Sequence, residues 1–507
     1  QDSLLVDSSA WTRLAPEGFA AVVANPPWEK IKLSRHEFIK RNGGTRQYGA
    51  AYAGHDLSGY ETGRVAAAAR SAALARLYPV LASGEPDLYV AFTALLLRLT
   101  RPGGAGAVFV PGGMIRSQNT AGLRRLLLQC SRTLSFTVLE NRAKFFAIDT
   151  RFKFVLCRFD AAEPKGRKAG TIQLAHAYGT EAGVRLAAPV RMARKTLADL
   201  SPDLTIPEVR DRREWQLFQK MQRAGLRWSD RASPWYPAFC REVDMTRETQ
   251  HFRRSPGPDL LPVIEGRMVQ PHRFGAKAYQ SGQGRSALWV AVPLGAARVV
   301  PQFWIAPAAL PKSVAVRANM LRVGFCDITG QTNERSMMAA LIPAGVVCGN
   351  KVPTILFPND PSDDRLFLWA AIVNSLPFDW ALRRVMTTTV NYFLLLGLTL
   401  PRIEPDSLPG RRLVDIARRL ALLDRAGPTG TEIGWRAADL RAEADAIVAM
   451  SYGLSQDDLL LMFRDFPLLD RGQPALLDEP KSTVTRDCVL ARFAALRRGA
   501  SLNGPTG

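Results

Sequence analysis

Short apolar runs and longer amphipathic stretches alternate through the first 200 residues. The run Ala21–Ala24 predicts a buried strand that stops at two prolines. An apolar helix over 87–99 then ends at a Pro-Gly-Gly break, and strands are expected over 105–110 and 152–159. Strands that alternate with helices are typical of an α/β domain built around one sheet.

The pattern changes along the rest of the chain. From about Ser233, short strand patterns, turns and interleaved Arg and aromatic residues predict a mixed α+β module, and from Asp406 helical spacing dominates. We therefore expect four parts: a first domain over 1–200 with a helical insertion at about 29–83, a linker helix over 201–232, a β-rich module over 233–405, and a small helical region over 406–507.

The charge balance points to a polyanionic partner. The chain carries 67 Lys and Arg against 46 Asp and Glu, a formal net charge of +21. It has no run of 18 apolar residues and no signal-peptide pattern at its start, so we expect a cytoplasmic protein without a membrane partner. The six cysteines and five histidines are dispersed, which fits a reducing compartment and predicts no metal site.

The most informative stretch follows the first strand and reads Asn25-Pro26-Pro27-Trp28. Pro26 and Pro27 fix the local backbone, so the Pro26 carbonyl is held in one direction beside the amide oxygen of Asn25. Trp28 adds a flat apolar face. Two converging acceptors and a stacking platform suit a planar group with an exocyclic NH2, such as an adenine extruded from a duplex.

The stretch from Phe19 to Trp28 resembles the catalytic motif of N6-adenine DNA methyltransferases of the gamma order. Ala20 departs from the Asp that the family commonly has there, outside the catalytic turn. Later landmarks also resemble the family, namely Asp87-Leu88-Tyr89, Pro102-Gly103-Gly104 and Leu123 to Leu127. The resemblance implies part of a Rossmann-like sheet of an S-adenosylmethionine-dependent methyltransferase over 1–200. Protein-glutamine and some RNA methyltransferases share the turn, and these activities remain alternatives.

The same resemblance assigns further residues. Asp7, which ends a short strand predicted over Ser3–Asp7, implies a bond to the adenine amino group of S-adenosylmethionine; the alternative is a helix N-cap. Phe146 matches the aromatic that stacks on the second face of the base, with Phe145 as the neighbouring alternative. The family's Gly-rich cofactor loop and ribose-binding acid come upstream of Asp7. We therefore expect an upstream chain segment or other defence-system subunits to complete the protein.

A second resemblance covers the β-rich module. The stretches 240–246, 261–269, 327–337 and 342–343 resemble the target-recognition half of large adenine methyltransferases in type IIG restriction-modification and in BREX and DISARM phage defence. It implies double-stranded DNA as a partner, with Arg, Asn and Gln reading base edges and Lys and Arg holding phosphates. The candidate DNA-binding residues by type are Arg267, Gln270, His272, Arg273, Lys277 and Arg335.

The sequence thus predicts a site-specific DNA adenine-N6 methyltransferase in a restriction-modification or phage-defence system. One alternative is a DNA-recognition subunit or fragment without activity of its own; another is an RNA or protein-glutamine methyltransferase. Pro258-Asp259 followed by Glu265-Gly266-Arg267 is only faintly similar to a restriction-nuclease motif, because Arg replaces Lys and the spacing is short. We predict no nuclease there.

Overall fold

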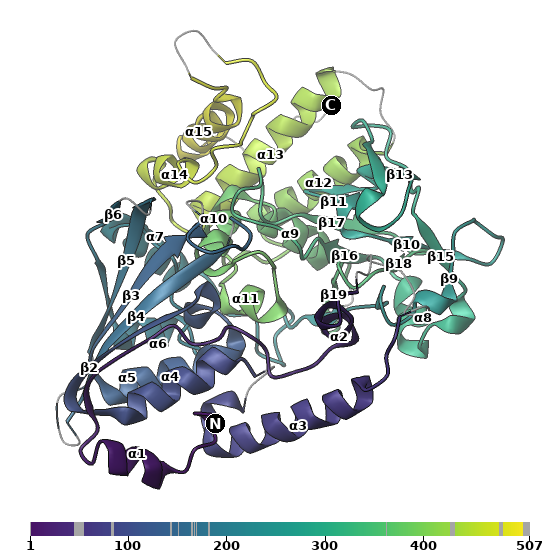
Figure 1. Ribbon diagram of the computed structural model, residues 1–507. Coiled ribbons are helices and arrows are strands. Elements are labelled where there is room, and N and C mark those ends of the chain that lie inside the picture. The colour runs from purple at the N-terminus through teal and green to yellow at the C-terminus, as the bar shows by residue number, and fades with distance from the viewer. Residues whose placement is uncertain are drawn as a thin grey trace. The chain divides into compact units, whose positions relative to one another are not determined.

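The computed structural model describes residues 2–44, 55–82, 86–141, 144–150, 152–163, 166, 168, 170–180, 183–360, 362–425, 431–475 and 480–499. The chain divides into two compact units, one within the first 216 residues and one from Leu217 onward. The division falls inside helix α7 (Arg212–Ala224). Each unit is described by itself (Figure 1).

The first unit is built on a seven-stranded sheet in the order β1-β2-β4-β3-β5-β6, with β7 paired to β5. The β1–β2 and β3–β5 pairs are parallel, and the other pairs are antiparallel. Helix α4 packs on β2, and α5 packs on β3. The strands are β1 (Phe19–Ala24), β2 (Thr100–Pro111), β3 (Ser131–Glu140), β4 (Lys153–Ala161), β5 (Thr171–Thr180), β6 (Gly183–Leu186) and β7 (Val190–Ala193).

The helices of this unit follow from local sequence signals. Helix α4 begins after Asp87 and consists almost wholly of buried residues, as its apolar run predicts. Ser34 and Glu37 form a capping box at the start of α2 within the predicted helical insertion. The helices are α1 (Ser8–Leu14), α2 (Arg35–Arg41), α3 (Tyr60–Leu77), α4 (Leu88–Leu99), α5 (Ala121–Cys130) and α6 (Arg194–Leu200). The fold is therefore mixed α/β; its assignment as a Rossmann-like sheet stays a prediction.

Two local expectations were wrong. Residues Ser3–Asp7 form turns and not a strand, because Asp7 acts as the N-cap of α1. The strand β1 forms as predicted, but of the four residues 21–24 only Val22 is buried, and Val23 is 82% exposed. Among the described residues β1 is the outermost strand and pairs with β2 alone, so one edge of it has no neighbouring strand.

The second unit contains two four-stranded sheets, in the orders β18-β10-β15-β9 and β17-β16-β19-β8, and the hairpins β11-β12 and β13-β14. Its strands are β8 (Ala238–Cys240), β9 (Phe252–Arg253), β10 (Leu261–Ile264), β11 (Val269–Gln270), β12 (Arg273–Phe274), β13 (Lys277–Ser281), β14 (Leu288–Ala291), β15 (Phe303–Ile305), β16 (Arg322–Phe325), β17 (Ala339–Ile342), β18 (Val347–Cys348) and β19 (Thr354–Leu356).

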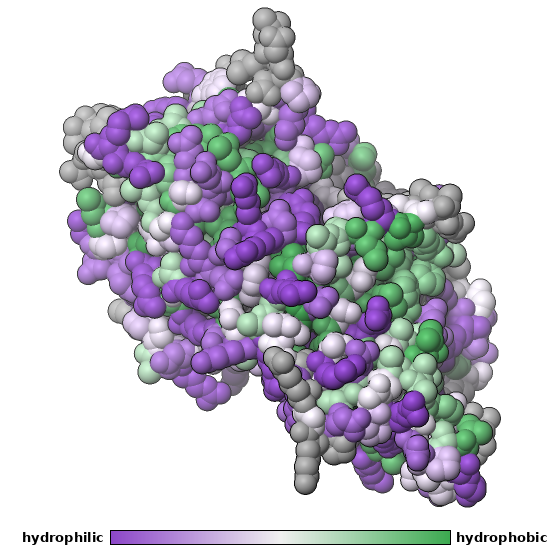
Figure 2. Space-filling view, turned by 90° about the vertical axis from the view of Figure 1, so that its left-hand side faces the viewer, coloured by the Kyte–Doolittle hydropathy of each residue, from purple (hydrophilic) through white to green (hydrophobic). Residues whose placement is uncertain are grey.

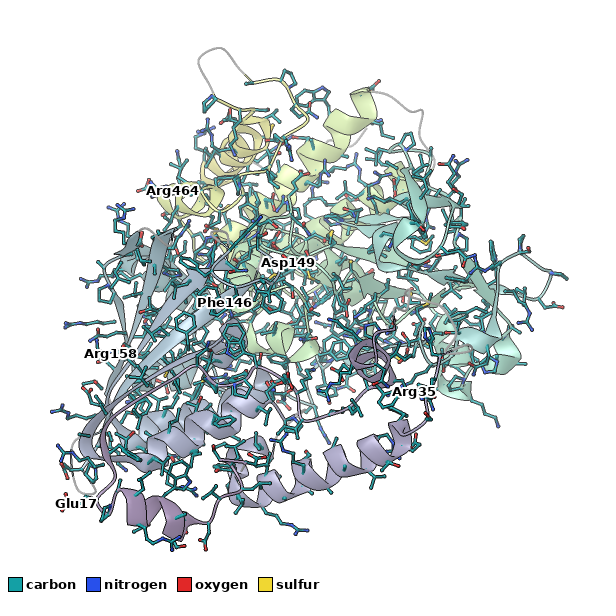
Figure 3. The ribbon with its side chains drawn as sticks, in the orientation of Figure 1. Glu17, Arg35, Phe146, Asp149, Arg158 and Arg464 are labelled. Carbon is teal, nitrogen blue, oxygen red and sulfur yellow. The ribbon has the colours of Figure 1, made fainter. Side chains whose placement is uncertain are left out.

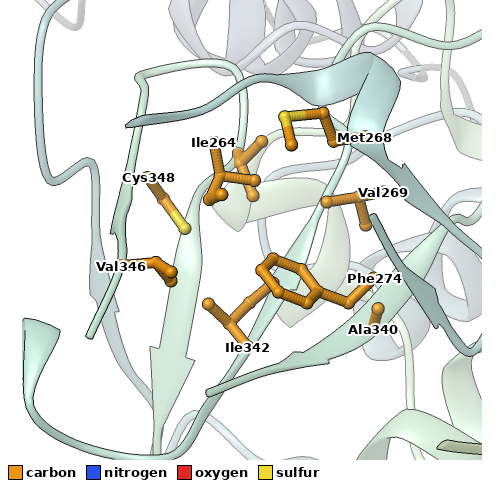
Figure 4. Close-up of a cluster of buried hydrophobic side chains, with 9 residues drawn as sticks. Ile264, Met268, Val269, Phe274, Ala340, Ile342, Val346 and Cys348 are labelled. Atoms are coloured by element: carbon orange, nitrogen blue, oxygen red, sulfur yellow. The ribbon is translucent and has the colours of Figure 1, made fainter. Parts of the chain in front are cut away.

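Buried clusters hold these short strands together. One contains Ile264, Met268, Phe274 and Ile342, contributed by four separate segments (Figure 4). Beside it, the fully buried Arg322 guanidinium donates to both Glu242 carboxylate oxygens at 2.6 and 2.9 Å. Short strands have few ladder hydrogen bonds, so these side-chain interactions fix their arrangement.

Helices make up the remainder of the second unit. They are α8 (Lys312–Ala318), α9 (Asp364–Val373), α10 (Leu376–Val385), α11 (Tyr392–Gly397), α12 (Leu408–Leu423), α13 (Thr431–Ser451), α14 (Gln456–Phe463) and α15 (Val484–Arg497). Helix α13 packs against both α12 and α15. Hydrophilic side chains cover much of the molecular face shown in Figure 2, with hydrophobic areas between them.

Candidate functional site

The Asn25-Pro26-Pro27-Trp28 turn follows directly from β1. Because β1 runs parallel to β2 and Ala24 pairs with Val108, the turn lies at the edge of the sheet where β2 also ends. Asn25 is exposed and Pro26 is buried. Within the described part of the chain, the Asn25 side chain and the Pro26 carbonyl make no hydrogen bond. Both acceptors are therefore unengaged within the described residues, and the exposed Asn25 side chain is accessible to a ligand.

The structure brings together the two aromatic residues predicted to hold a base. The rings of Trp28 and Phe146 lie 5.0 Å apart, inclined at 57°. Trp28 Nε1 donates to the Phe109 carbonyl of β2 at 3.3 Å, which fixes the indole over the end of that strand. Phe145 instead packs edge-on against Phe154 at 6.1 Å. At this separation Trp28 and Phe146 contact each other, so a base between them has to move them apart.

Phe146 owes its position to a residue that the sequence did not single out. Asn141, which is fully buried, follows the last residue of β3. Its amide donates to the carbonyls of Phe146 at 3.0 Å and Ile148 at 3.1 Å, and its Oδ1 accepts from the Phe146 N–H at 3.0 Å. Figure 3 shows Phe146 near one end of the sheet and Arg158 of β4 toward the other. A single Asn directly after a strand was the available signal.

A buried ionic cluster lies in the same unit, around Glu208. Its carboxylate binds the side chains of Arg116 and Lys153, and His176 Nε2 lies 3.7 Å away. Burial alone would raise the pKa of Glu208, but the charges of Lys153 and Arg116 outweigh it and hold the pKa well below its ordinary value. Lys153 directly precedes Phe154 in β4, and Arg116 follows the short turn after β2, so the cluster lies at the same end of the sheet as the aromatic group.

Asp7 is the residue predicted to bind the cofactor. Its Oδ1 accepts from the Ser9 N–H at 3.1 Å, so the alternative N-cap role is present in the structure. These hydrogen bonds lower the pKa of Asp7 and keep it ionised. Its Oδ2 accepts no hydrogen bond from any described residue. One carboxylate oxygen thus remains able to accept from an amino group, and the cofactor role stays a prediction.

The second unit contains a cleft of about 1310 Å³. Five of the six predicted DNA-binding residues line it, four from the stretch 267–277 and one from a distant segment: Arg267, Gln270, Arg273, Lys277 and Arg335. The described lining holds seven Lys and Arg side chains against three acids, and Lys351, Arg441 and Arg471 complete the basic group. A cleft with this charge balance attracts polyanions.

The predicted residues differ in how they are engaged. Arg273 donates to Asp424 at 2.7 Å, and Arg335 lies 3.4 Å from Asp445, so both have acidic partners inside the protein. Arg267 lies over the Trp289 ring at 5.1 Å and makes no ion pair with a described acid. His272 is buried, and burial lowers its pKa to about 3. A neutral side chain buried to this extent reaches a base edge only after a conformational change.

Glu265 is a cleft residue that the sequence reasoning did not choose for binding. It directly precedes the turn that carries Arg267, and its buried Oε1 finds no hydrogen-bond donor among the described residues. Burial raises the pKa of Glu265 to about 7, opposed by the Arg267 charge. The sequence feature that could have identified Glu265 is its position two residues before Arg267, a predicted DNA-binding residue. A carboxylate there can accept from a base amino group.

Two further properties of the described residues are negative. No set of three or more His, Cys, Asp or Glu side chains is placed to hold a metal ion. None of the described helices combines the length and apolar character needed to cross a bilayer.

No family model and no curated protein matches the sequence. Among solved structures, the chain is similar over 92% of its length to the type IIL restriction-modification enzyme MmeI in complex with DNA, with 11% identity and a TM-score of 0.49. It is similar over 94% of its length to the type IIG restriction endonuclease BpuSI, with 12% identity and a TM-score of 0.31.

A third similarity, over 35% of this chain and 40% of the other, is to a Listeria monocytogenes protein described as a class I S-adenosylmethionine-dependent methyltransferase. That match has 14% identity and a TM-score of 0.20. The matches cover 59% of MmeI and 56% of BpuSI, so the chain spans less than two thirds of either enzyme.

Proposed function

We propose that this chain transfers a methyl group from S-adenosylmethionine to the N6 amine of an adenine extruded from duplex DNA, as part of a restriction-modification or phage-defence system. The observation that carries the proposal is the turn after β1, where two unengaged acceptors, Asn25 Oδ1 and the Pro26 carbonyl, adjoin the Trp28 ring. The basic cleft of the second unit, lined by Arg267 and Lys277, supports DNA as the substrate.

The chemistry follows from what these residues can hold. The adenine amine is a weak nucleophile because its lone pair is delocalised into the ring. Acceptance of its two hydrogens by Asn25 Oδ1 and the Pro26 carbonyl favours a pyramidal nitrogen whose lone pair can form the new N–C bond. This stabilisation acts mainly in the transition state, while Trp28 and Phe146 hold the base. Formation of the N–C bond would be matched by breakage of the methyl–sulfur bond of the sulfonium, whose electron pair would stay on sulfur, and one amine proton would pass to solvent.

S-adenosylmethionine supplies an electrophilic methyl group on a sulfonium when it is bound. The residue of this chain that fits it is Asp7, whose free Oδ2 is a suitable acceptor for the adenine amino group of the cofactor. The low pKa of Asp7 keeps that oxygen charged.

The test is single-turnover methyl transfer from labelled S-adenosylmethionine to duplex DNA by wild type and by Asn25→Ala. We expect the variant to lose methyl transfer while DNA binding stays within a factor of about two, because Asn25 acts on the amine and not on phosphate. Glu29→Gln is the matched control directly after the turn, since its exposed side chain supplies neither acceptor. Methylation by Asn25→Ala within about tenfold of wild type would contradict the proposal.

A further inference from the structure

The recognition cleft has a second wall, which the C-terminal helices form. Gly434, Trp435, Ala438 and Arg441 of α13 line the same cleft as the strand residues. Residues at these spacings share one face of a helix. The loop between α14 and α15 adds Arg471 and Gln473 to the same lining.

The side chains on this wall are suited to a ligand. Arg471 is exposed, and neither Arg441 nor Arg471 forms an ion pair with any acid in the described ranges. Arg441 also has exposed surface, but burial of part of its side chain lowers the pKa of its guanidinium, and the charges of Glu334 and Asp445 act against that shift. Trp435 is 57% exposed at the same wall. Two unpaired guanidinium groups beside an exposed indole match a sugar–phosphate backbone, which offers anionic oxygens and an apolar sugar face.

The wall is also held rigidly in place. On its other sides α13 is anchored by Glu443, which accepts from Arg412 at 2.6 Å, and by Asp439, which accepts from Arg492 at 2.8 Å. Asp470 caps the start of the next segment by accepting from the Thr485 N–H at 2.8 Å, which fixes the loop before Arg471. A preorganised surface loses little side-chain and loop entropy on binding.

We infer that this C-terminal wall, with Trp435, Arg441 and Arg471, grips the backbone of the duplex whose bases face the strand wall. The inference rests on the proposed DNA substrate and adds a role for the helical region. DNA is therefore held from two sides, by base-reading residues on one and phosphate-binding residues on the other.

The test measures duplex DNA binding by the full chain against salt concentration. Each phosphate contact contributes about 0.9 to the slope of log affinity against log salt, so Arg441→Ala/Arg471→Ala should reduce the slope by about 1.8. Between 50 and 200 mM salt, wild-type affinity then falls about twelvefold more than that of the variant. Trp435→Ala should weaken binding with an unchanged slope, because the indole carries no charge.

The matched control is Arg464→Ala/Arg497→Ala, which removes the same charge from exposed positions of this region outside the cleft. Its slope should equal that of wild type. Equal slopes for the cleft pair and the control pair, with both proteins melting at the wild-type temperature, would overturn the inference. Arg471→Ala alone, with a slope reduced by about 0.9, covers the case in which Arg441 is needed for folding.

The outcomes separate the two proposals. If Arg267→Ala weakens DNA binding and Arg441→Ala/Arg471→Ala does not, the C-terminal wall does not bind the backbone, but the proposal that DNA is the substrate stands. If the slopes change as expected and wild type transfers no methyl group to any duplex, the proposed catalysis is wrong and the second wall stands. If wild type does not bind duplex DNA at all, both are wrong.

Discussion

Replacing Glu265 by Gln should stabilise the protein, and the gain should depend on pH. The carboxyl has a pKa of about 7 in the folded protein, raised by burial from an ordinary value of 4.5. The folded state therefore holds this proton over a range in which the unfolded chain has lost it. A difference of about 2.5 units corresponds to about 3 kcal/mol at 1.36 kcal/mol per unit.

The raised pKa of Glu265 determines how stability changes with pH. Below pH 4.5 the carboxyl is neutral in both states and costs nothing, and as pH rises to 7 the cost of the buried charge appears in full. The free energy of unfolding of Glu265→Gln should therefore match that of wild type near pH 4 and exceed it by about 3 kcal/mol above pH 8. Comparing the two proteins at each pH cancels the titration of all other groups.

The assay is guanidinium unfolding followed by tryptophan fluorescence, at pH 4, 6, 7 and 8.5. Glu334→Gln is the matched control, because Glu334 lines the same cleft but is exposed. We expect its effect to be small and equal at all four pH values. Unfolding curves for wild type and Glu265→Gln that shift in parallel over the whole range would refute the reasoning, since they would place the carboxyl in contact with solvent.

Three further predictions concern single side chains. Trp28→Ala should suppress the brightening of a 2-aminopurine at the target position and Trp28→Phe should retain it, because stacking needs an aromatic face; equal signals in both would remove Trp28 from the base site. Arg335→Ala should lower stability by about 2 kcal/mol, because the buried Asp445 loses its cation, and Arg335→Ala/Asp445→Asn should restore most of it in thermal melts. Asn141→Ala should reduce methyl transfer at least about tenfold while Asn141→Asp retains more, as single-turnover assays would show, because the Phe146 carbonyl and N–H both lose their partner.

The sequence predicted those helices and strands of the first unit whose residues themselves form a clear pattern. The helix over 88–99 and the strands β2 and β4 follow from apolar runs bounded by Pro and Gly. The role of Asp7 was harder to predict, because an acid before two serines is compatible with both the end of a strand and a helix N-cap. In the structure its side chain accepts from the Ser9 N–H, so Asp7 is an N-cap. Burial of β1 depends on what lies beside the strand, which periodicity cannot report.

Residue type likewise predicted which residues line the cleft, but it did not predict which of them bind DNA and which bind an acid of the protein. Arg267 and Arg335 are the same residue type and line the same cleft, but Arg335 meets Asp445, 110 positions later in the chain, and Arg267 forms no ion pair with a described acid. No local pattern can specify a partner at that separation. The cleft side chains best suited to bind DNA are thus those that form no ion pair with a described acid, and these include Arg441 and Arg471 of the helical wall. It follows that specificity should change when Arg267 is replaced, whereas replacing Arg441 should weaken binding to every sequence alike.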